Sequence, residues 1–134
     1  MREIKFRAWD KGLKRMIYLS EPTVENDDFS GIVFKLRDYF VSAFSSDRIE
    51  DLELMQYTGL RDKNGREVYE GDIVRFKDWW DEEMVGEVRY SEKDMAFTIV
   101  NDFWDGFPIM YADDLEVIGN IYENPELLEE VDEE

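Results

Sequence analysis

The stretch that decides the fold of this 134-residue chain is Tyr69-Glu70-Gly71-Asp72-Ile73-Val74-Arg75-Phe76. Its Gly-Asp pair predicts a tight turn, because glycine adopts backbone conformations that other residues avoid. The turn leads into a strand in which Ile73 and Val74 point to opposite faces. Before this stretch, Asp62–Gly65 predicts a hairpin turn between two short strands within residues 54–69, because Asn-Gly tolerates positive φ at both of its positions.

Alternating apolar and polar residues recur after Phe76, in the ranges 86–90, 96–100 and 115–122. This period of two is typical of half-buried strands. Short strands at close spacing, in this order of glycine and apolar residues, are typical of SH3-like barrels. We therefore predict an SH3-like β-barrel over residues 54–122.

The amino-terminal part of the chain shows the same period of two. One face carries Ile4, Phe6 and Ala8. A turn at Asp10–Gly12 and a return strand at 15–19 then complete a predicted opening β-hairpin. The stretch 39–44 fits either a strand or a short helix. We expect an N-terminal β-rich region over residues 1–53.

The carboxy-terminal residues 123–134 predict a short α-helix followed by an acidic tail. Asn124 is a favoured N-cap residue, Pro125 suits the first helical position, and Glu126 lies near the positive end of the helix dipole. The helix is expected to pack onto the barrel or a partner through Leu127, Leu128 and Val131. The predicted fold class is mainly β: an N-terminal β-hairpin region, a C-terminal SH3-like β-barrel and a short terminal α-helix.

The composition narrows the chemistry that the chain can perform. Hydrophobic residues make up 43% of it and aromatic residues 15%, which is enough for a packed core. The sequence has no Cys and no His, which excludes disulfides, Cys/His zinc sites, thiol nucleophiles and His-based triads. The glycines do not form a phosphate-binding motif. We expect a protein that is not an enzyme, with no catalytic residues, no cofactor and no metal site.

Neither a membrane span nor a signal peptide is expected. The longest uninterrupted apolar run has four residues, as in Ile109–Ala112. A membrane span needs ~20 apolar residues. The charged start of the chain, Met1–Lys5, also lacks the apolar region of a signal peptide. These observations predict a cytoplasmic protein that makes no contact with a membrane.

Charge is unevenly distributed along the chain, whose formal net charge is -18. Residues 1–20 carry six basic and two acidic side chains, whereas residues 78–134 carry two basic and nineteen acidic ones. Such a surface repels phosphate groups, so direct binding to nucleic acid is disfavoured. The candidate basic patch is the opening hairpin, with Arg2, Lys5, Arg7, Lys11, Lys14 and Arg15. We expect these residues to pair with acids of the same protein; an exposed, acid-free hairpin would favour a nucleic-acid-binding barrel.

Aromatic residues in two expected barrel loops form the candidate partner-binding site. The first loop carries Trp79, Trp80, Asp81, Glu82 and Glu83, and the second carries Phe103, Trp104 and Phe107. In SH3-like barrels such loops frame a groove in which aromatic side chains bind peptides, bases or methylated lysine. The neighbouring acids favour a basic partner. Two interpretations stay open: the rings contact a partner, or they seal the barrel ends or pack against the amino-terminal hairpin.

Three blocks of sequence carry a resemblance to a known family. They are residues 1–10 (MREIKFRAWD) with Met16, Leu54–Val74 (LMQYTGLRDKNGREVYEGDIV) and Val117–Leu128 (VIGNIYENPELL). In these blocks the chain resembles the YopX proteins of bacteriophages and prophages. The resemblance implies a phage-borne accessory protein in the cytoplasm of a bacterial host, with an SH3-like C-terminal barrel and no established activity. It implies no catalytic residues.

These observations support several hypotheses about function. The leading one is a non-enzymatic module that binds a host or phage protein through the acidic, aromatic loops. A homo-oligomer is also expected, because small barrels often bury apolar edges between copies. One alternative is an acidic mimic of nucleic acid that inhibits a host DNA-binding enzyme. Another is a metal-dependent hydrolase that uses the acids Asp27-Asp28, Asp81–Glu83 or Asp113-Asp114.

Overall fold

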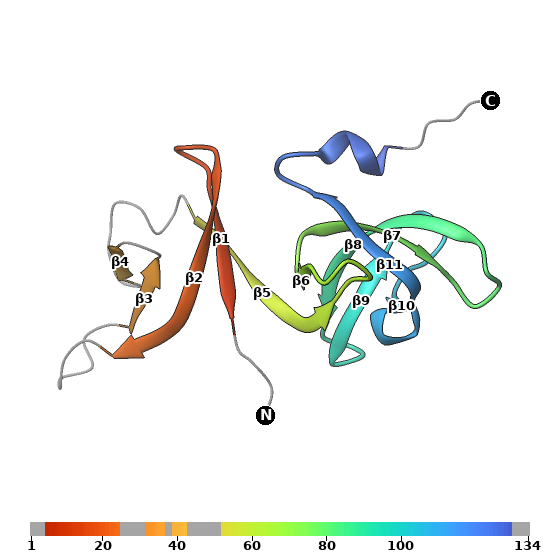
Figure 1. Cartoon of the computed structure of the whole chain (residues 1–134), viewed down its shortest axis with the longest axis horizontal. Helices are drawn as coiled ribbons and strands as arrows, with labels where there is room; N and C mark the ends of the chain where they lie inside the picture. The colour runs from red at the N-terminus through yellow and green to blue at the C-terminus, as the bar shows by residue number, and fades with distance from the viewer. Residues whose placement is uncertain (1–4, 25–31, 37–38, 43–51, 130–134) are drawn as a thin grey trace. The chain divides into compact units, whose positions relative to one another are not determined.

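The computed structural model describes four parts of the chain, residues 5–24, 32–36, 39–42 and 52–129 (Figure 1). They form two antiparallel β-sheets, and the only helices among them are two short 3-10 helices. The prediction of a mainly β protein is therefore confirmed. The chain divides into two compact units, Met1–Tyr57 and Thr58–Glu134, and strand β5 (Leu52–Arg61) runs through the boundary.

The first unit is built around the central strand β1. Its strands are β1 (Phe6–Asp10), β2 (Arg15–Val24), β3 (Ile32–Leu36), β4 (Tyr39–Ser42) and the first part of β5. The six-stranded sheet has the order β4-β3-β2-β1-β5-β6, and its last strand, β6 (Glu67–Tyr69), belongs to the second unit. The pairing of β1 with β2 ends with Asp10 opposite Arg15, which confirms the predicted opening hairpin. The stretch left open at 39–44 is a strand as far as Ser42; residues 43 and 44 lie outside the described residues.

Among the basic side chains of the opening hairpin, Lys11, Lys14 and Arg15 are exposed. Arg7 is buried, although its place on a strand predicted half exposure. The Nζ atom of Lys11 lies 3.3 Å from an Oε atom of Glu53, which is the kind of internal pairing that we expected. Arg2 lies outside the described residues.

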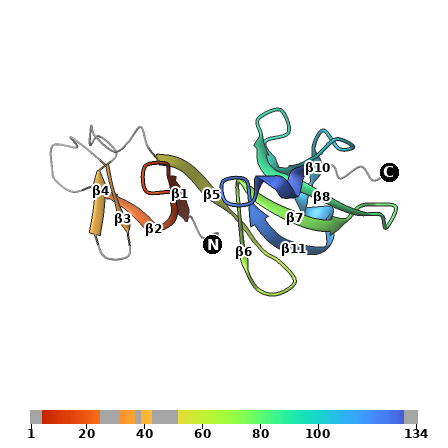
Figure 2. The ribbon, with the colours of Figure 1, turned by 90° about the horizontal axis from the view of Figure 1, so that it is seen from above.

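The second unit contains a five-stranded sheet that curls into a half-barrel (Figure 1). Its elements are β6 (Glu67–Tyr69), β7 (Asp72–Lys77), β8 (Glu83–Ser91), β9 (Ala96–Val100), β10 (Phe107–Pro108), η2 (Ile109–Tyr111), β11 (Asp113–Asn120) and η3 (Pro125–Leu128). The sheet has the order β10-β9-β8-β7-β11. Figure 2 shows β7 and β11 side by side. These two strands, which come first and last along the chain among the strands of this sheet, are therefore neighbours.

Two irregularities bend the last strand around the sheet. The pairing of β11 with β7 shifts register between Asp113 and Glu116, and again between Val117 and Gly119. Bulges of this kind increase the local twist and bend the strand. This curvature lets a short sheet enclose its own core.

The core of the second unit lies inside the curled sheet. It consists of the buried residues Val68, Val74, Phe76, Val88, Ile99, Phe107, Ile109, Leu115 and Val117. Ile73 is also completely buried, so β7 is covered at both of the neighbouring positions that point to opposite faces. Each fully buried aliphatic side chain of this size contributes about 1.5–3 kcal/mol to folding.

The predicted terminal α-helix is wrong. The described part of residues 123–134 forms only the four-residue 3-10 helix η3, and the backbone is extended again at Glu129. Asn124 is the N-cap residue of η3 but makes no side-chain capping hydrogen bond; its Oδ1 atom instead accepts the backbone N–H of Asn120 at 3.2 Å. No residue of η3 is buried, and Val131 lies outside the described residues.

Candidate functional site

A turn centred on Asp78 presents the first pair of aromatic side chains. Asp78 follows β7 and is buried. Its Oδ1 atom accepts the backbone N–H groups of Trp80 and Glu82, each at 3.0 Å. The backbone closes the turn, because Asp81 N–H donates to the Asp78 carbonyl at 3.0 Å. The conformation of the Trp79-Trp80 pair is therefore set by one carboxylate beneath it.

The same carboxylate reaches the second aromatic loop. The Oδ2 atom of Asp78 accepts the indole Nε1–H of Trp104 at 3.3 Å. Burial raises the pKa of Asp78, but these hydrogen bonds favour the carboxylate more strongly, so the pKa lies below its ordinary value. Asp78 is thus held as an anion that joins the two loops.

Asn101 organises the second loop in a similar way. Its Oδ1 atom accepts the backbone N–H groups of Phe103 and Trp104 at 2.9 and 2.6 Å. Its Nδ2 atom donates to the carbonyl oxygen of Val85 on β8 at 3.0 Å. Asn101 therefore fastens the loop that carries Phe103 and Trp104 to β8.

Trp104 is the centre of a continuous network of rings. Its ring centroid lies 5.3 Å from Trp79, 5.9 Å from Trp80 and 5.4 Å from Phe103. The pair with Trp80 is stacked, with 20° between the ring planes, and the other two pairs are edge-to-face. Below them lies Phe107, 4.9 Å from Trp104. Such aromatic pairs each contribute about 0.5–1.5 kcal/mol beyond their buried area.

The network runs from the core to the surface. Phe107 is completely buried and Trp104 is partly buried, whereas Trp79, Trp80 and Phe103 are 54%, 68% and 67% exposed. Phe107, predicted as a contact residue in the second loop, lies instead in β10 and supports the cluster from below. The two interpretations of these aromatics divide between residues: Phe107 is buried in the core of the half-barrel, and the three rings above it stay open to solvent.

Tyr111 extends the exposed cluster and was missed by the sequence analysis. It is 55% exposed, and its ring centroid lies 6.1 Å from that of Trp79. It belongs to η2, in which only Ile109 is buried. The available signal was the run of apolar residues after Pro108, which one short turn cannot bury completely. We call the exposed rings of Trp79, Trp80, Phe103 and Tyr111 the aromatic surface.

Exposed acids border the aromatic surface along the chain. Asp81, Glu82 and Glu83 follow the two tryptophans, and Glu83 pairs with Arg75, whose Nε atom lies 3.4 Å from it. Asp102 and Asp105 are exposed in the second loop. The predicted site residues from both loops are thus brought together in one part of the second unit.

The structure also bears on a possible metal site and on membrane-spanning helices. Within the described ranges, no three acidic side chains are grouped so that they could hold a metal ion, and Asp27-Asp28 lies outside these ranges. None of the helices in the described part of the chain is long and apolar enough to cross a membrane.

The chain is similar to a known family and to solved structures. A family model described as YopX protein matches residues 5–129. Protein EF1440 from Enterococcus faecalis is 33% identical; the match covers 96% of this chain and 100% of that chain, with a TM-score of 0.62. Protein yopX from Bacillus subtilis is 27% identical; the match covers 93% of this chain and 98% of that chain, with a TM-score of 0.52.

Among curated proteins, no significant match was found. The family model spans all of the described residues, and the similarity to EF1440 extends over both units. The chain therefore belongs to the YopX protein family.

Proposed function

We propose that this protein is a non-enzymatic accessory protein of a phage or prophage, and that its aromatic surface binds a basic segment of a host or phage protein. One observation carries the proposal: Trp80 and Phe103 are each about two-thirds exposed, although hydrogen bonds fix the backbone that carries them. Rings held in fixed positions lose little conformational entropy on binding. A surface of this kind suits recognition.

The charge around the rings favours a basic partner. Asp81, Glu82, Asp102 and Asp105 are exposed beside the rings in sequence. A Lys or Arg side chain over a tryptophan ring gains about 0.5–2 kcal/mol, depending on how fully the pair is desolvated. Carboxylates at the rim also increase the association rate of a positively charged segment.

The strand order supports the finer assignment of an SH3-like barrel. β7 pairs with both β8 and the last strand β11. Along the chain, the 3-10 helix η2 lies between β10 and β11. A small barrel of this order presents its loops at the ends of the sheet, where they are free to carry binding residues. The aromatic surface lies on two such loops and on η2.

The test is recovery of a partner from the lysate of an infected or prophage-bearing host. The wild type is compared with the double variant Trp80→Ala/Phe103→Ala, which removes the two most exposed rings. Met95→Ala is the matched control, because it shortens an exposed apolar side chain in the β8–β9 turn. We expect the double variant to recover at least about tenfold less partner, equivalent to 1.4 kcal/mol. The control should recover as much as the wild type.

Three outcomes contradict the proposal in different ways. Equal recovery by the double variant excludes the aromatic surface as the binding site. A DNA-handling partner that is released steeply by salt, equally from wild type and variant, indicates nucleic-acid mimicry by the acidic surface. Recovery of this chain alone indicates self-association. Circular dichroism of each variant checks that the fold is retained.

A further inference from the structure

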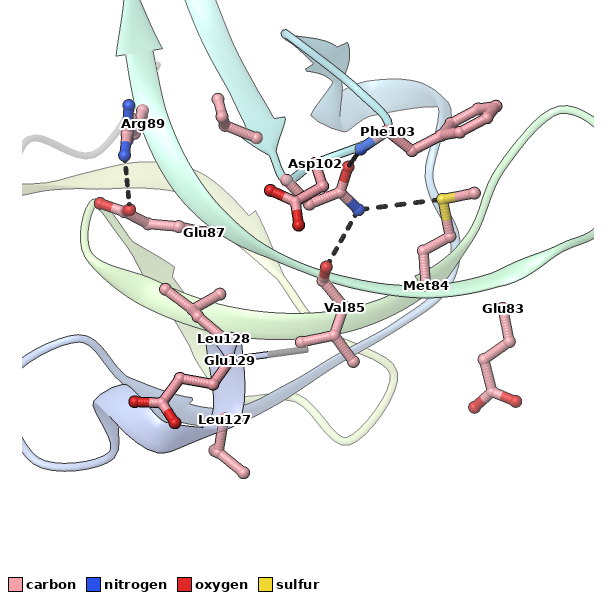
Figure 3. A pocket seen from close by; sticks show the side chains of 12 residues that line it. Glu83, Met84, Val85, Glu87, Arg89, Asp102, Phe103, Leu127, Leu128 and Glu129 are labelled. Carbon is pink, nitrogen blue, oxygen red and sulfur yellow. Dashed lines mark hydrogen bonds and ion pairs between the residues drawn. The ribbon is translucent and has the colours of Figure 1, made fainter. Parts of the chain in front are cut away.

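A groove of about 590 Å³ lies next to the aromatic surface, between β8, the loop after β9 and η3 (Figure 3). Its apolar lining includes Met84 and Val85 of β8, Val100 of β9, and Leu128 of η3. In Figure 3 the side chain of Leu128 lies on the side of η3 that faces Val85. The volume falls within the ~300–1,000 Å³ of sites that hold drug-sized ligands. A few residues of an extended peptide have this size.

The rim of the groove is acidic. Its carboxylates are Glu83, Glu87, Asp102 and Glu129, and its only cation within the described residues is Arg89. Arg89 is engaged by Glu87, because Nη2 lies 3.0 Å from Oε1. The rim therefore keeps a net negative charge. An occupant that complements both parts carries aliphatic and basic side chains.

The groove and the aromatic surface are continuous. Phe103 lines the groove and also contacts the ring of Trp104 at a centroid distance of 5.4 Å. Asn101 lines the groove and fixes the backbone of Phe103. A segment that binds over the rings can therefore continue into the groove past Phe103.

We propose that the groove is the second half of this binding surface, and that it takes an extended segment of the partner in which aliphatic residues lie next to Lys or Arg. This inference rests on the proposed function. Phosphate-bearing ligands do not fit an acidic rim. A second copy of this chain is disfavoured as the occupant, because each copy carries a net charge of -18.

The test uses a random octapeptide library that is selected separately on the wild type and on Leu128→Asp. This substitution places a carboxylate on the apolar lining, and η3 has no buried residue whose loss would unfold the chain. Leu13→Asp is the matched control, because Leu13 is an exposed leucine in the opening hairpin. We expect wild-type selection to enrich peptides with Leu, Ile or Val beside Lys or Arg. Leu128→Asp should keep the basic preference and lose the aliphatic one.

The best wild-type peptide is then titrated against all three proteins by fluorescence anisotropy. We expect about tenfold weaker binding to Leu128→Asp and unchanged binding to Leu13→Asp. In the wild type, the methyl NMR signals of Val85 and Leu128 should shift on binding.

The possible failures are distinguishable. Enrichment of basic residues without aliphatic ones overturns the groove assignment and leaves the aromatic surface in place. The absence of any basic preference overturns the proposed function as well. A wild-type molecular mass in solution that falls to that of a single chain in Leu128→Asp assigns the groove to contact between copies, which also overturns the inference.

Discussion

Two turns of the second unit have the same backbone architecture and different uses. One begins at Asp62, between β5 and β6, and the other at Asp78, between β7 and β8. In both, the aspartate Oδ1 atom accepts the backbone N–H groups two and four residues later, at 2.8–3.0 Å. In both, the residue three positions later has positive φ: Gly65 at +86° and Asp81 at +62°.

The two turns differ in what the second carboxylate oxygen holds. Asp62 Oδ2 accepts the backbone N–H of Val117 at 2.9 Å, whereas Asp78 Oδ2 accepts the indole N–H of Trp104 at 3.3 Å. The first turn also donates the N–H of Lys63 to the Leu115 carbonyl at 2.8 Å. It therefore holds the outer edge of β11, while the second turn holds a ring.

The residues between the anchor points show the same contrast. Lys63 and Asn64 are polar and exposed, whereas Trp79 and Trp80 occupy the equivalent places in the second turn. The same turn conformation holds β11 in the first case and carries two exposed tryptophans in the second. The Asp78 turn therefore differs from the Asp62 turn through the two tryptophans that it carries, because the local hydrogen bonds of the two turns are the same.

The largest expected effect comes from Asp62→Ala. The substitution removes three hydrogen bonds and leaves the buried Val117 N–H without its acceptor. We expect the free energy of unfolding to fall by about 2–4 kcal/mol, measured by urea denaturation. Asp78→Ala should destabilise less, because none of its partners is the backbone of another strand. If the two losses are equal, the distinction between an edge-holding turn and a ring-holding turn is incorrect.

Exchanging the residues at positive φ should change stability in opposite directions. Gly65→Ala places a Cβ atom where nothing lies within 4 Å, so its effect reports backbone strain alone. We expect a loss of about 1 kcal/mol. Asp81→Gly should relieve strain and gain about 0.5 kcal/mol, measured in the same urea titrations.

Asp81→Asn is the control for the charge that Asp81→Gly also removes. Asparagine keeps the side-chain shape and tolerates positive φ, so a gain from backbone relief should be absent. A gain of equal size in both variants shows that charge repulsion, rather than strain, was removed.

Acid should destabilise the protein through both carboxylates. Burial raises the pKa of Asp62, but the hydrogen bonds from the backbone N–H groups of Val117, Arg66 and Asn64 lower it by a larger amount. The pKa of Asp62 therefore lies below its ordinary value of 3.8. A lowered pKa gives stability that is present above pH 3.8 and is lost as the pH falls through the folded-state value. Urea midpoints measured between pH 2 and pH 7, a range around the ordinary carboxylate pKa, should decline only at the acidic end. Asp62→Asn should flatten that decline; an unchanged slope contradicts the assignment.

The smallest expected effect comes from Trp104→Phe. Phenylalanine keeps a ring beside Trp79 and Phe107 but has no N–H to donate to Asp78. The pKa of Asp78 should rise toward its ordinary value, as measured by a carboxyl NMR titration, with little change in stability. Phe107→Leu is the comparison, because it changes a ring of the same cluster that makes no hydrogen bond with Asp78. An equal pKa rise in both variants assigns the shift to packing.

The local hydrogen bonds of both turns join residues that are close together in the sequence. Asp62 and Asp78 bond to residues two and four positions later, within reach of any chain that folds back there. Their third partners, Val117 and Trp104, are 55 and 26 residues away, so no local pattern shows them. Asn124 shows that a local pattern can also mislead, because its side chain bonds to the backbone of Asn120 and not to the N–H groups of the helix that follows it.

Sequence by itself determined most of the strands, the two hairpins and the family, because alternation, turn residues and the three blocks that resemble the family depend on neighbours along the chain. It also placed Trp79, Trp80, Phe103 and Trp104 in two loops, whereas Phe107, expected in the second loop, lies in β10. Only the tertiary structure decided that Phe107 is buried while Phe103, four residues earlier, is exposed. The physical reason is that burial depends on which distant segments pack against a side chain, and both residues have the same local preference for the core.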